Sequence, residues 1–141
     1  MYELVVHALL CCDRIITENN GKKGLIGVFQ SFQFSRVPSP AVPWFIYGAL
    51  GSVSRGTHEF SVSVTHGQSS EEVAARSGEI HVAGEREDVE LVLPITCNFH
   101  HFGAYVITLE VGDELVASRI LRVITAASNK PAPRRSNGSS G

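Results

Sequence analysis

Apolar and polar residues alternate along most of this chain, in short runs separated by Gly, Pro, Ser and Asn. A period of two residues is typical of a β-strand with one buried face, whereas an amphipathic helix repeats at about 3.6 residues. The runs lie at residues 4–12, 15–17, 25–34, 44–50, 59–65, 79–83, 89–93, 105–111 and 115–124. The pattern therefore predicts an all-β chain without a helix.

Three of these runs predict the sheet in more detail. Residues 59–65 alternate strictly between apolar residues and Ser or Thr, apart from Glu59, which indicates a sheet with one dry face and one wet face. Residues 105–111 and 115–124 flank a Gly-Asp turn, and this arrangement predicts a β-hairpin.

Turn signals divide the remaining runs. Residues 19–21 read Asn-Asn-Gly, a strong signal for chain reversal after the first strand. The charged sequence GERED at 84–88 predicts a turn between two strands. Pro38, Pro40 and Pro43 predict a loop, because proline cannot donate a hydrogen bond to a central ladder.

Residues 70–77 are the one ambiguous stretch, since the sequence EEVAAR within them could open a helix. The sequence VAAR at 73–76, however, matches VASR at 116–119, and each follows an alternating strand and a polar turn. The shared pattern predicts that residues 70–77 are extended and belong to a second hairpin.

Together these elements predict one domain over residues 1–126, an antiparallel β-sandwich of about eight or nine strands. Its general architecture is expected to be immunoglobulin-like, with a small barrel as the alternative. Residues 127–141 lack apolar periodicity and are predicted to be a disordered tail.

Charge and cysteine content indicate which partners and which cellular compartment are expected. The formal net charge is −2, and removing the three cations after residue 127 leaves −5 on the rest, which disfavours nucleic-acid binding. Residues 4–12 are apolar, but the only preceding charge is Glu3 and the run is too short to span a bilayer, so we expect neither a targeting signal nor a membrane segment. An odd number of cysteines, Cys11, Cys12 and Cys97, favours reduced thiols in the cytoplasm.

Two segments resemble the opening of a family of small prokaryotic proteins known only as a domain of unknown function. They are HALLCCDRII at 7–16 and GKKGLIGVF at 21–29, and the pattern from 102 to 119 is similar to the family's closing hairpin. The resemblance covers roughly residues 2–124. It implies a cytosolic β-sandwich in a bacterium or archaeon, and it implies no activity and no site residues.

The six histidines suggest no metal site or other cofactor. His100 and His101 are adjacent, so on an extended backbone their rings should diverge, and His58, His66 and His81 fall on different predicted strands or their ends. No spacing typical of zinc ligands occurs. We therefore expect histidines at the surface or rim.

No catalytic motif is evident either. The chain lacks a Gly-x-Ser-x-Gly elbow and a phosphate-binding loop, and its paired carboxylates lie in predicted solvated turns. Cys97 precedes His100 and His101, and a Cys-His pair is the most plausible enzymatic hypothesis, although the spacing is unspecific. We therefore predict no catalytic residues.

The aromatic strand is the main candidate for a binding surface. Trp44 and Phe45 must face opposite ways on a strand, so one of them, together with Tyr47, could add to an exposed apolar patch. The competing interpretation places Trp44 across the core of the domain. The ligand or partner surface predicted from the sequence is therefore Trp44, Phe45 and Tyr47.

These observations favour a non-catalytic protein-interaction or assembly module, which binds a protein partner or forms a homo-oligomer through a sheet face or an unpaired edge strand. The alternative is a small-ligand or carbohydrate-binding domain that uses the aromatic strand.

Overall fold

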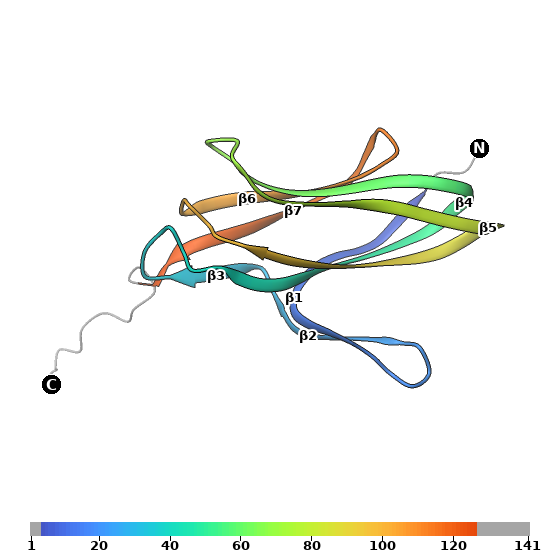
Figure 1. Ribbon diagram of the computed structural model, residues 1–141, viewed down its shortest axis with the longest axis horizontal. Coiled ribbons are helices and arrows are strands. Elements are labelled where there is room, and N and C mark those ends of the chain that lie inside the picture. Colours follow the sequence, from blue (N-terminus) through green and yellow to red (C-terminus); the bar gives the residue numbers. More distant parts are fainter. Residues whose placement is uncertain (1–3, 127–141) are drawn as a thin grey trace, which may run out of the picture.

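The computed structural model describes residues 4–126, which form seven β-strands and no helix (Figure 1). The strands are β1 (Val5–Thr17), β2 (Lys23–Phe29), β3 (Ser31–Phe34), β4 (Val42–His66), β5 (Glu72–Cys97), β6 (Gly103–Val111) and β7 (Glu114–Thr125). The all-β prediction is confirmed, and within this range no helix could cross a membrane. The tail predicted at residues 127–141 lies outside the described residues.

The strands form one open, mostly antiparallel sheet. Its order is β2-β1-β4-β6-β7-β3, and β5 pairs with β4 outside this path. Among the strands of residues 4–126, only β3 and β7 pair in parallel. In the described chain β2, β3 and β5 therefore each have one partner strand, so each leaves one edge open.

Two very long strands give the sheet its shape. β4 and β5 have 25 and 26 residues and pair antiparallel along nearly their whole length. The first span of β4 pairs with β1 over residues 45–51, and its second span pairs with β6 over residues 60–66. Figure 1 shows the sheet folded over at the end where both strands pass from one layer to the other.

This fold-over divides the sheet into two halves. The first half contains β2, β1, the first span of β4 and the second span of β5, and the second half contains the remaining spans with β6, β7 and β3. The register of the β4–β5 ladder shifts between Leu50 and Val53 and again between Ser54 and Gly56. These irregularities lie where both strands change halves, because a bulge lets a strand bend sharply.

The described residues form seven strands, and the prediction of about eight or nine is wrong because several predicted runs join. The runs 4–12 and 15–17 join in β1, residues 44–50 and 59–65 belong to the single strand β4, and residues 84–88 continue β5 instead of forming a turn. Arg86 and Glu87 are exposed, yet both pair with β4. Their charged side chains therefore indicate that this part of the strand is exposed to solvent, and they do not indicate a turn. Residues 25–34 divide at Gln30 into β2 and β3, which pair with different strands.

The other local predictions are confirmed. Residues 72–77 are extended within β5, and β6 and β7 form the hairpin with Gly112 at φ +64° in its turn. The hairpin of β1 and β2 reverses through Gly21, at φ +88°. Pro43 is the exception in the proline segment, because it lies inside β4 opposite Thr96.

One hydrophobic core lies between the two halves of the sheet. Its fully buried members include Trp44 and Ile46 from the first half and Val64, Ile107 and Leu121 from the second. At one end, aromatic rings from β2, from β3 and from the connection after β5 close the core around Trp44. The ring centroids of Phe32, Phe29 and Phe99 lie 5.8, 5.9 and 6.5 Å from that of Trp44.

Candidate interaction surface

The two spans of β4 carry different chemistry on the side that faces away from the core. In both spans, alternate residues are buried in the core, and the residues between them face outward. The outward residues of the first span are Phe45, Tyr47 and Ala49, and those of the second span are Ser61, Ser63 and Thr65. The same strand thus presents an apolar exterior on one half of the sheet and a polar exterior on the other.

Neighbouring strands extend both surfaces. On the first half, cross-strand partners form the rows Val28–Cys12–Phe45–Pro94 and Leu10–Tyr47–Val92, which we call the apolar outer face. On the second half the corresponding row is Ala75–Ser63–Thr108–Ser118. Side chains that are directly opposite on adjacent strands are close neighbours, so the members of each row are in register on one side of the sheet. Cys12 is the buried member of its row.

Much of the apolar outer face is accessible to solvent. Val28 and Val92 are 51% and 37% exposed, Pro94 is exposed, and Leu10, Phe45 and Tyr47 are half-buried. Single exposed apolar residues are ordinary on a protein surface, but a contiguous patch of them is typical of a binding site.

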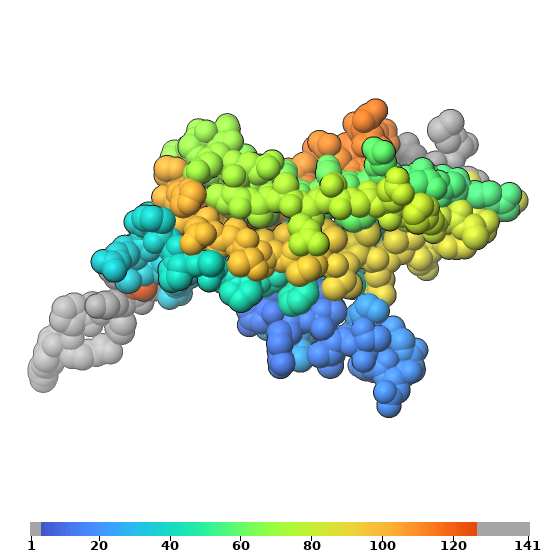
Figure 2. All heavy atoms as spheres, viewed as in Figure 1, coloured from blue at the N-terminus to red at the C-terminus, as the bar shows by residue number. Residues whose placement is uncertain are grey.

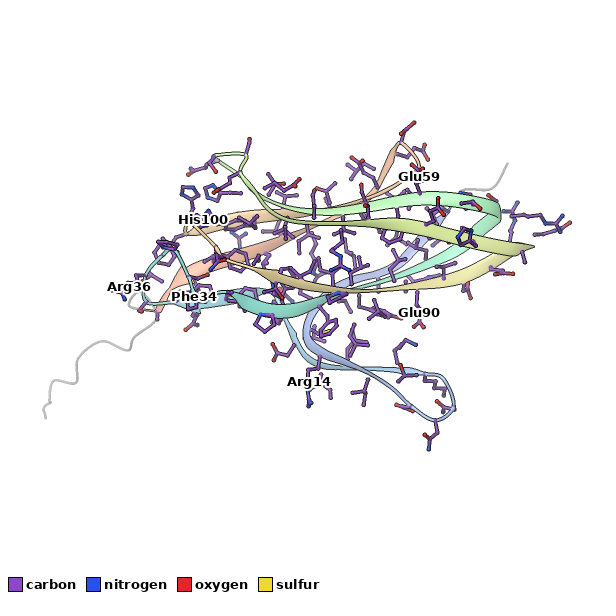
Figure 3. All side chains as sticks on the ribbon, viewed as in Figure 1. Arg14, Phe34, Arg36, Glu59, Glu90 and His100 are labelled. Atoms are coloured by element: carbon purple, nitrogen blue, oxygen red, sulfur yellow. The ribbon has the colours of Figure 1, made fainter. Side chains whose placement is uncertain are left out.

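A polar group borders this face. The Tyr47 hydroxyl donates a hydrogen bond to Glu90, and the Lys23 ammonium lies 3.8 Å from the same carboxylate. Burial, followed by the hydrogen bond to Glu90, raises the pKa of Tyr47 to about 12. The hydroxyl therefore remains a protonated donor at every physiological pH, and it fixes the Tyr47 ring on the sheet. Figure 3 shows Glu90 on the side of the body that faces the arm formed by β1 and β2.

The predicted surface residues divide between the two sides of the sheet. Trp44 is 1% exposed and belongs to the core, so it is not available to a ligand or a partner. The physical reason is the surrounding ring cluster, in which a large apolar side chain is removed from water. Phe45 and Tyr47 point the opposite way and lie on the apolar outer face.

Sequence reasoning missed the residues that complete this face. Leu10, Val28 and Val92 lie in predicted strands, but the sequence alone does not reveal which strands become neighbours or in which register. The available signal was the alternation of residues 89–93, whose outward member Val92 is apolar where a wet face would have a polar residue.

An arm extends from the first half of the sheet. β1 pairs with β4 only as far as Cys12, and from there to Thr17 it pairs with β2 alone. Ile16 and Ile26 on this arm are 45% and 39% exposed. Figure 2 shows the arm standing out from the body, and Figure 3 shows Arg14 on it.

A histidine cluster lies at the end of the molecule where the connections after β4 and β5 meet. His100 Nδ1 lies 2.8 Å and His101 Nε2 3.3 Å from separate oxygens of the Glu71 carboxylate. The His101 ring stacks on that of buried His66, with centroids 4.6 Å apart. The expected divergence of His100 and His101 is wrong, because residues 98–102 are not an extended strand.

The ring nitrogens of the clustered histidines form hydrogen bonds and ion pairs with other groups of the same chain. The backbone N–H of Ser69 donates to His66 Nδ1, so His66 Nε2 carries the proton that it directs at the Phe102 carbonyl oxygen, 3.2 Å away. Within residues 4–126 no group of three or more His, Cys, Asp or Glu side chains is placed to hold a metal ion. The histidine cluster joins the connection after β4 to the connection after β5. His58 and His81 are not part of it and lie at the β4–β5 ladder.

The cysteines are poorly placed for nucleophilic chemistry. All three are free and buried, and burial raises the pKa of Cys97 and raises that of Cys11 to about 12. A nucleophilic cysteine requires a stabilised thiolate. The described contacts of His100 and His101 involve Glu71, His66 and Tyr105 but not Cys97.

Comparisons with known proteins give one family and two distant structural likenesses. A model of the family described as "Family of unknown function (DUF6941)" matches residues 7–124. No curated protein sequence matches the chain.

Two solved structures resemble the chain over 86% of its length. One is the Pseudomonas fluorescens alkylpurine DNA glycosylase AlkC bound to DNA containing an abasic site analog, at 11% sequence identity and a TM-score of 0.43. The other is the β-glucosidase from Listeria innocua in complex with isofagomine, at 13% identity and a TM-score of 0.43. The matches cover 30% and 16% of those chains, and they carry no argument about activity.

Proposed function

The chain belongs to DUF6941, a family of unknown function, and from this premise we propose that it is a non-catalytic protein-interaction or assembly module. The observation that carries the proposal is the contrast between the outward residues of the two spans of β4, which are Phe45, Tyr47 and Ala49 in one and Ser61, Ser63 and Thr65 in the other. One half exposes the apolar outer face, and the other exposes a row rich in Ser and Thr.

Both halves of the sheet face the same solvent, so exposure to water alone does not explain why their outward residues on β4 differ. Stability of the isolated domain requires only the inward residues to be apolar, and the second span of β4 meets that requirement with Ser61, Ser63 and Thr65 outside. On the neighbouring strand β7, Ile120 and Leu115 are exposed on the same side as these residues. Covering apolar surface is worth about 25 cal/mol per Å², so the apolar outer face gains free energy when a partner excludes water from it. A protein partner is the occupant best suited to a broad sheet face.

The test compares two substitutions on opposite exteriors. Val92→Lys places a charge on the apolar outer face, and Thr108→Lys places the same charge on the polar exterior. The wild-type chain and both variants are recovered from their own host, and their complexes are weighed by native mass spectrometry. We expect a stoichiometric complex with a partner protein in the wild type and in Thr108→Lys, and its loss in Val92→Lys.

Two results would count against this function. Recovery of the wild-type chain only as a monomer without a partner would contradict the proposed function. A complex that survives in Val92→Lys but not in Thr108→Lys would place the binding surface on the polar exterior. Circular dichroism of each variant separates a lost contact from a lost fold.

We also propose the finer architecture and the compartment. The core between the two folded halves supports a β-sandwich of general immunoglobulin-like architecture, and the resemblance to small prokaryotic proteins agrees with it. Three free cysteines support a reducing cytoplasm, since proteins of oxidising compartments usually pair their cysteines in disulfides. Thiol counting on the chain isolated under non-reducing conditions tests the compartment, with three free thiols per chain expected.

A further inference from the structure

We infer that the open edge of β2 pairs antiparallel with β2 of a second copy, about a two-fold axis through Ile26. This dimer rests on the proposed function, because it joins the apolar outer faces of two copies into one continuous surface. The starting observation is that β2 is an unpaired edge with exposed apolar side chains. Ile26 and Val28 are 39% and 51% exposed, and the neighbouring Ile16 is 45% exposed.

These three side chains share one face of the arm. Ile26 is opposite Arg14 on β1, Val28 is opposite Cys12, and Ile16 is opposite Gly24. Cross-strand partners and alternate residues along a strand point to the same face. That face continues directly into the apolar outer face through Cys12, which pairs with Phe45.

The other long edge of the molecule is protected against strand addition, and β2 is not. On β5, Pro94 has no N–H to donate, and the Arg76 guanidinium donates to the Pro94 carbonyl oxygen at 2.9 Å. Proline and charge at an edge are the usual obstacles to edge pairing. β2 contains no proline, and Lys23 is its only charged residue.

The sequence of β2 is complementary to itself in the antiparallel register. With Ile26 opposite Ile26 of the second copy, Gly24 faces Val28 and Lys23 faces Phe29, so small residues meet large ones and no like charges meet. Like charges directly opposite each other destabilise a strand pair, and their absence favours this pairing. Because the arm stands out from the body, a second arm has room to approach it (Figure 2).

Disulfide trapping tests the two-fold axis. Ile26→Cys places two thiols directly opposite each other in the dimer, whereas Leu115→Cys places a thiol at a more exposed site on β7, where Leu115 is 62% exposed. The native cysteines are buried and provide a low background. Under mild oxidation we expect Ile26→Cys to cross-link roughly a thousandfold faster than Leu115→Cys, because pairing raises the effective concentration from about micromolar to about millimolar.

Light scattering after gel filtration completes the test. We expect the wild-type chain to have twice the 15.3 kDa mass of one chain, and Ile26→Lys to have the mass of one. A monomeric wild type, or an Ile26→Cys that cross-links no faster than Leu115→Cys, would overturn the dimer. The proposed function fails separately, when Val92→Lys retains the partner complex, so the two failures are distinguishable.

Discussion

Ser39 shows how a single buried hydroxyl can hold two connections together. It precedes β4 and is almost completely buried, and its Oγ accepts a hydrogen bond from the backbone N–H of Phe99 at 2.9 Å. Its carbonyl oxygen accepts another from the Asn98 side chain at 2.9 Å. The segment before β4 is thus fixed to the connection that follows β5.

Replacing Ser39 with Ala should destabilise the fold, because the buried Phe99 N–H loses its acceptor at that site. An unsatisfied buried donor costs about 1–3 kcal/mol in the free energy of unfolding. Denaturant unfolding followed by Trp44 fluorescence measures the change. The matched control Ser63→Ala, on the polar exterior, should stay within about 0.5 kcal/mol of the wild type. Equal effects of both substitutions would contradict the role of Ser39.

The cysteines should be inert in the folded chain. Burial raises the pKa of Cys97, so we expect Cys97 to react with a thiol reagent at neutral pH more slowly than free cysteine. Unfolding should make all three thiols reactive, and mass spectrometry after timed labelling gives the rate at each site. Faster labelling of Cys97 than of free cysteine would reopen the hypothesis of a Cys-His enzyme.

At the scale of the element, the continuity of β4 and β5 is the feature that matters most. Each strand crosses from one half of the sheet to the other, and the ladder between them is irregular only near the crossing and at one residue close to the far end. Residues 52–56 and 83–88 are therefore β-strand in conformation, but they lack the regular pairing and the second neighbouring strand that residues 60–64 of β4 have.

Hydrogen exchange should resolve this difference within a single strand. We expect the amides of residues 52–56 to exchange faster than those of 60–64, which pair with both β5 and β6 and flank the buried Val62 and Val64. Local opening is easiest where regular hydrogen bonds and buried contacts are few. Uniform protection along β4 would show that the crossing is as stable as the centre of the sheet.

The sequence predicted these elements well where the pattern is local, and less well where partners are distant. Strict alternation in residues 59–65 and the Gly-Asp turn before β7 depend on neighbouring residues, and both predictions are confirmed. The charged residues 84–88 resemble a turn, because exposure alone does not distinguish a loop from a strand that is solvated on both faces. Phe45 and Tyr47 were identifiable as candidates, but Val28 joins them only through pairing of β1 with both β2 and β4.

For the molecule as a whole, Glu71 is expected to make the free energy of unfolding depend on pH. Its hydrogen bond with His100 is the main cause that lowers the pKa of the Glu71 carboxyl in the folded state. A group whose pKa is lower in the folded state stabilises the fold above its unfolded pKa, and this contribution is lost as the pH falls through the folded pKa.

Glu71→Gln should therefore be less stable than the wild type at pH 7, and the difference should shrink between about pH 5 and pH 3, near the ordinary carboxyl pKa. Urea unfolding at a series of pH values measures it. Glu72→Gln provides the control, since Glu72 adjoins Glu71 in the chain and is exposed. A stability difference for Glu71→Gln that does not change with pH would indicate that its contacts with His100 and His101 do not depend on charge.

The crossing of β4 and β5 also constrains how the gene of such a protein can change. A single inserted codon within either strand would exchange the core and solvent positions of every residue between the insertion and the next bulge. Such an insertion would disrupt the core packing of one half of the molecule and leave the other half unchanged. Because β4 and β5 contribute to both halves, insertions in these two strands should be selected against along their whole length. Among members of the family, differences in length should therefore accumulate in the reversals near residues 19–21, 67–70 and 112–113, where an added residue moves no strand.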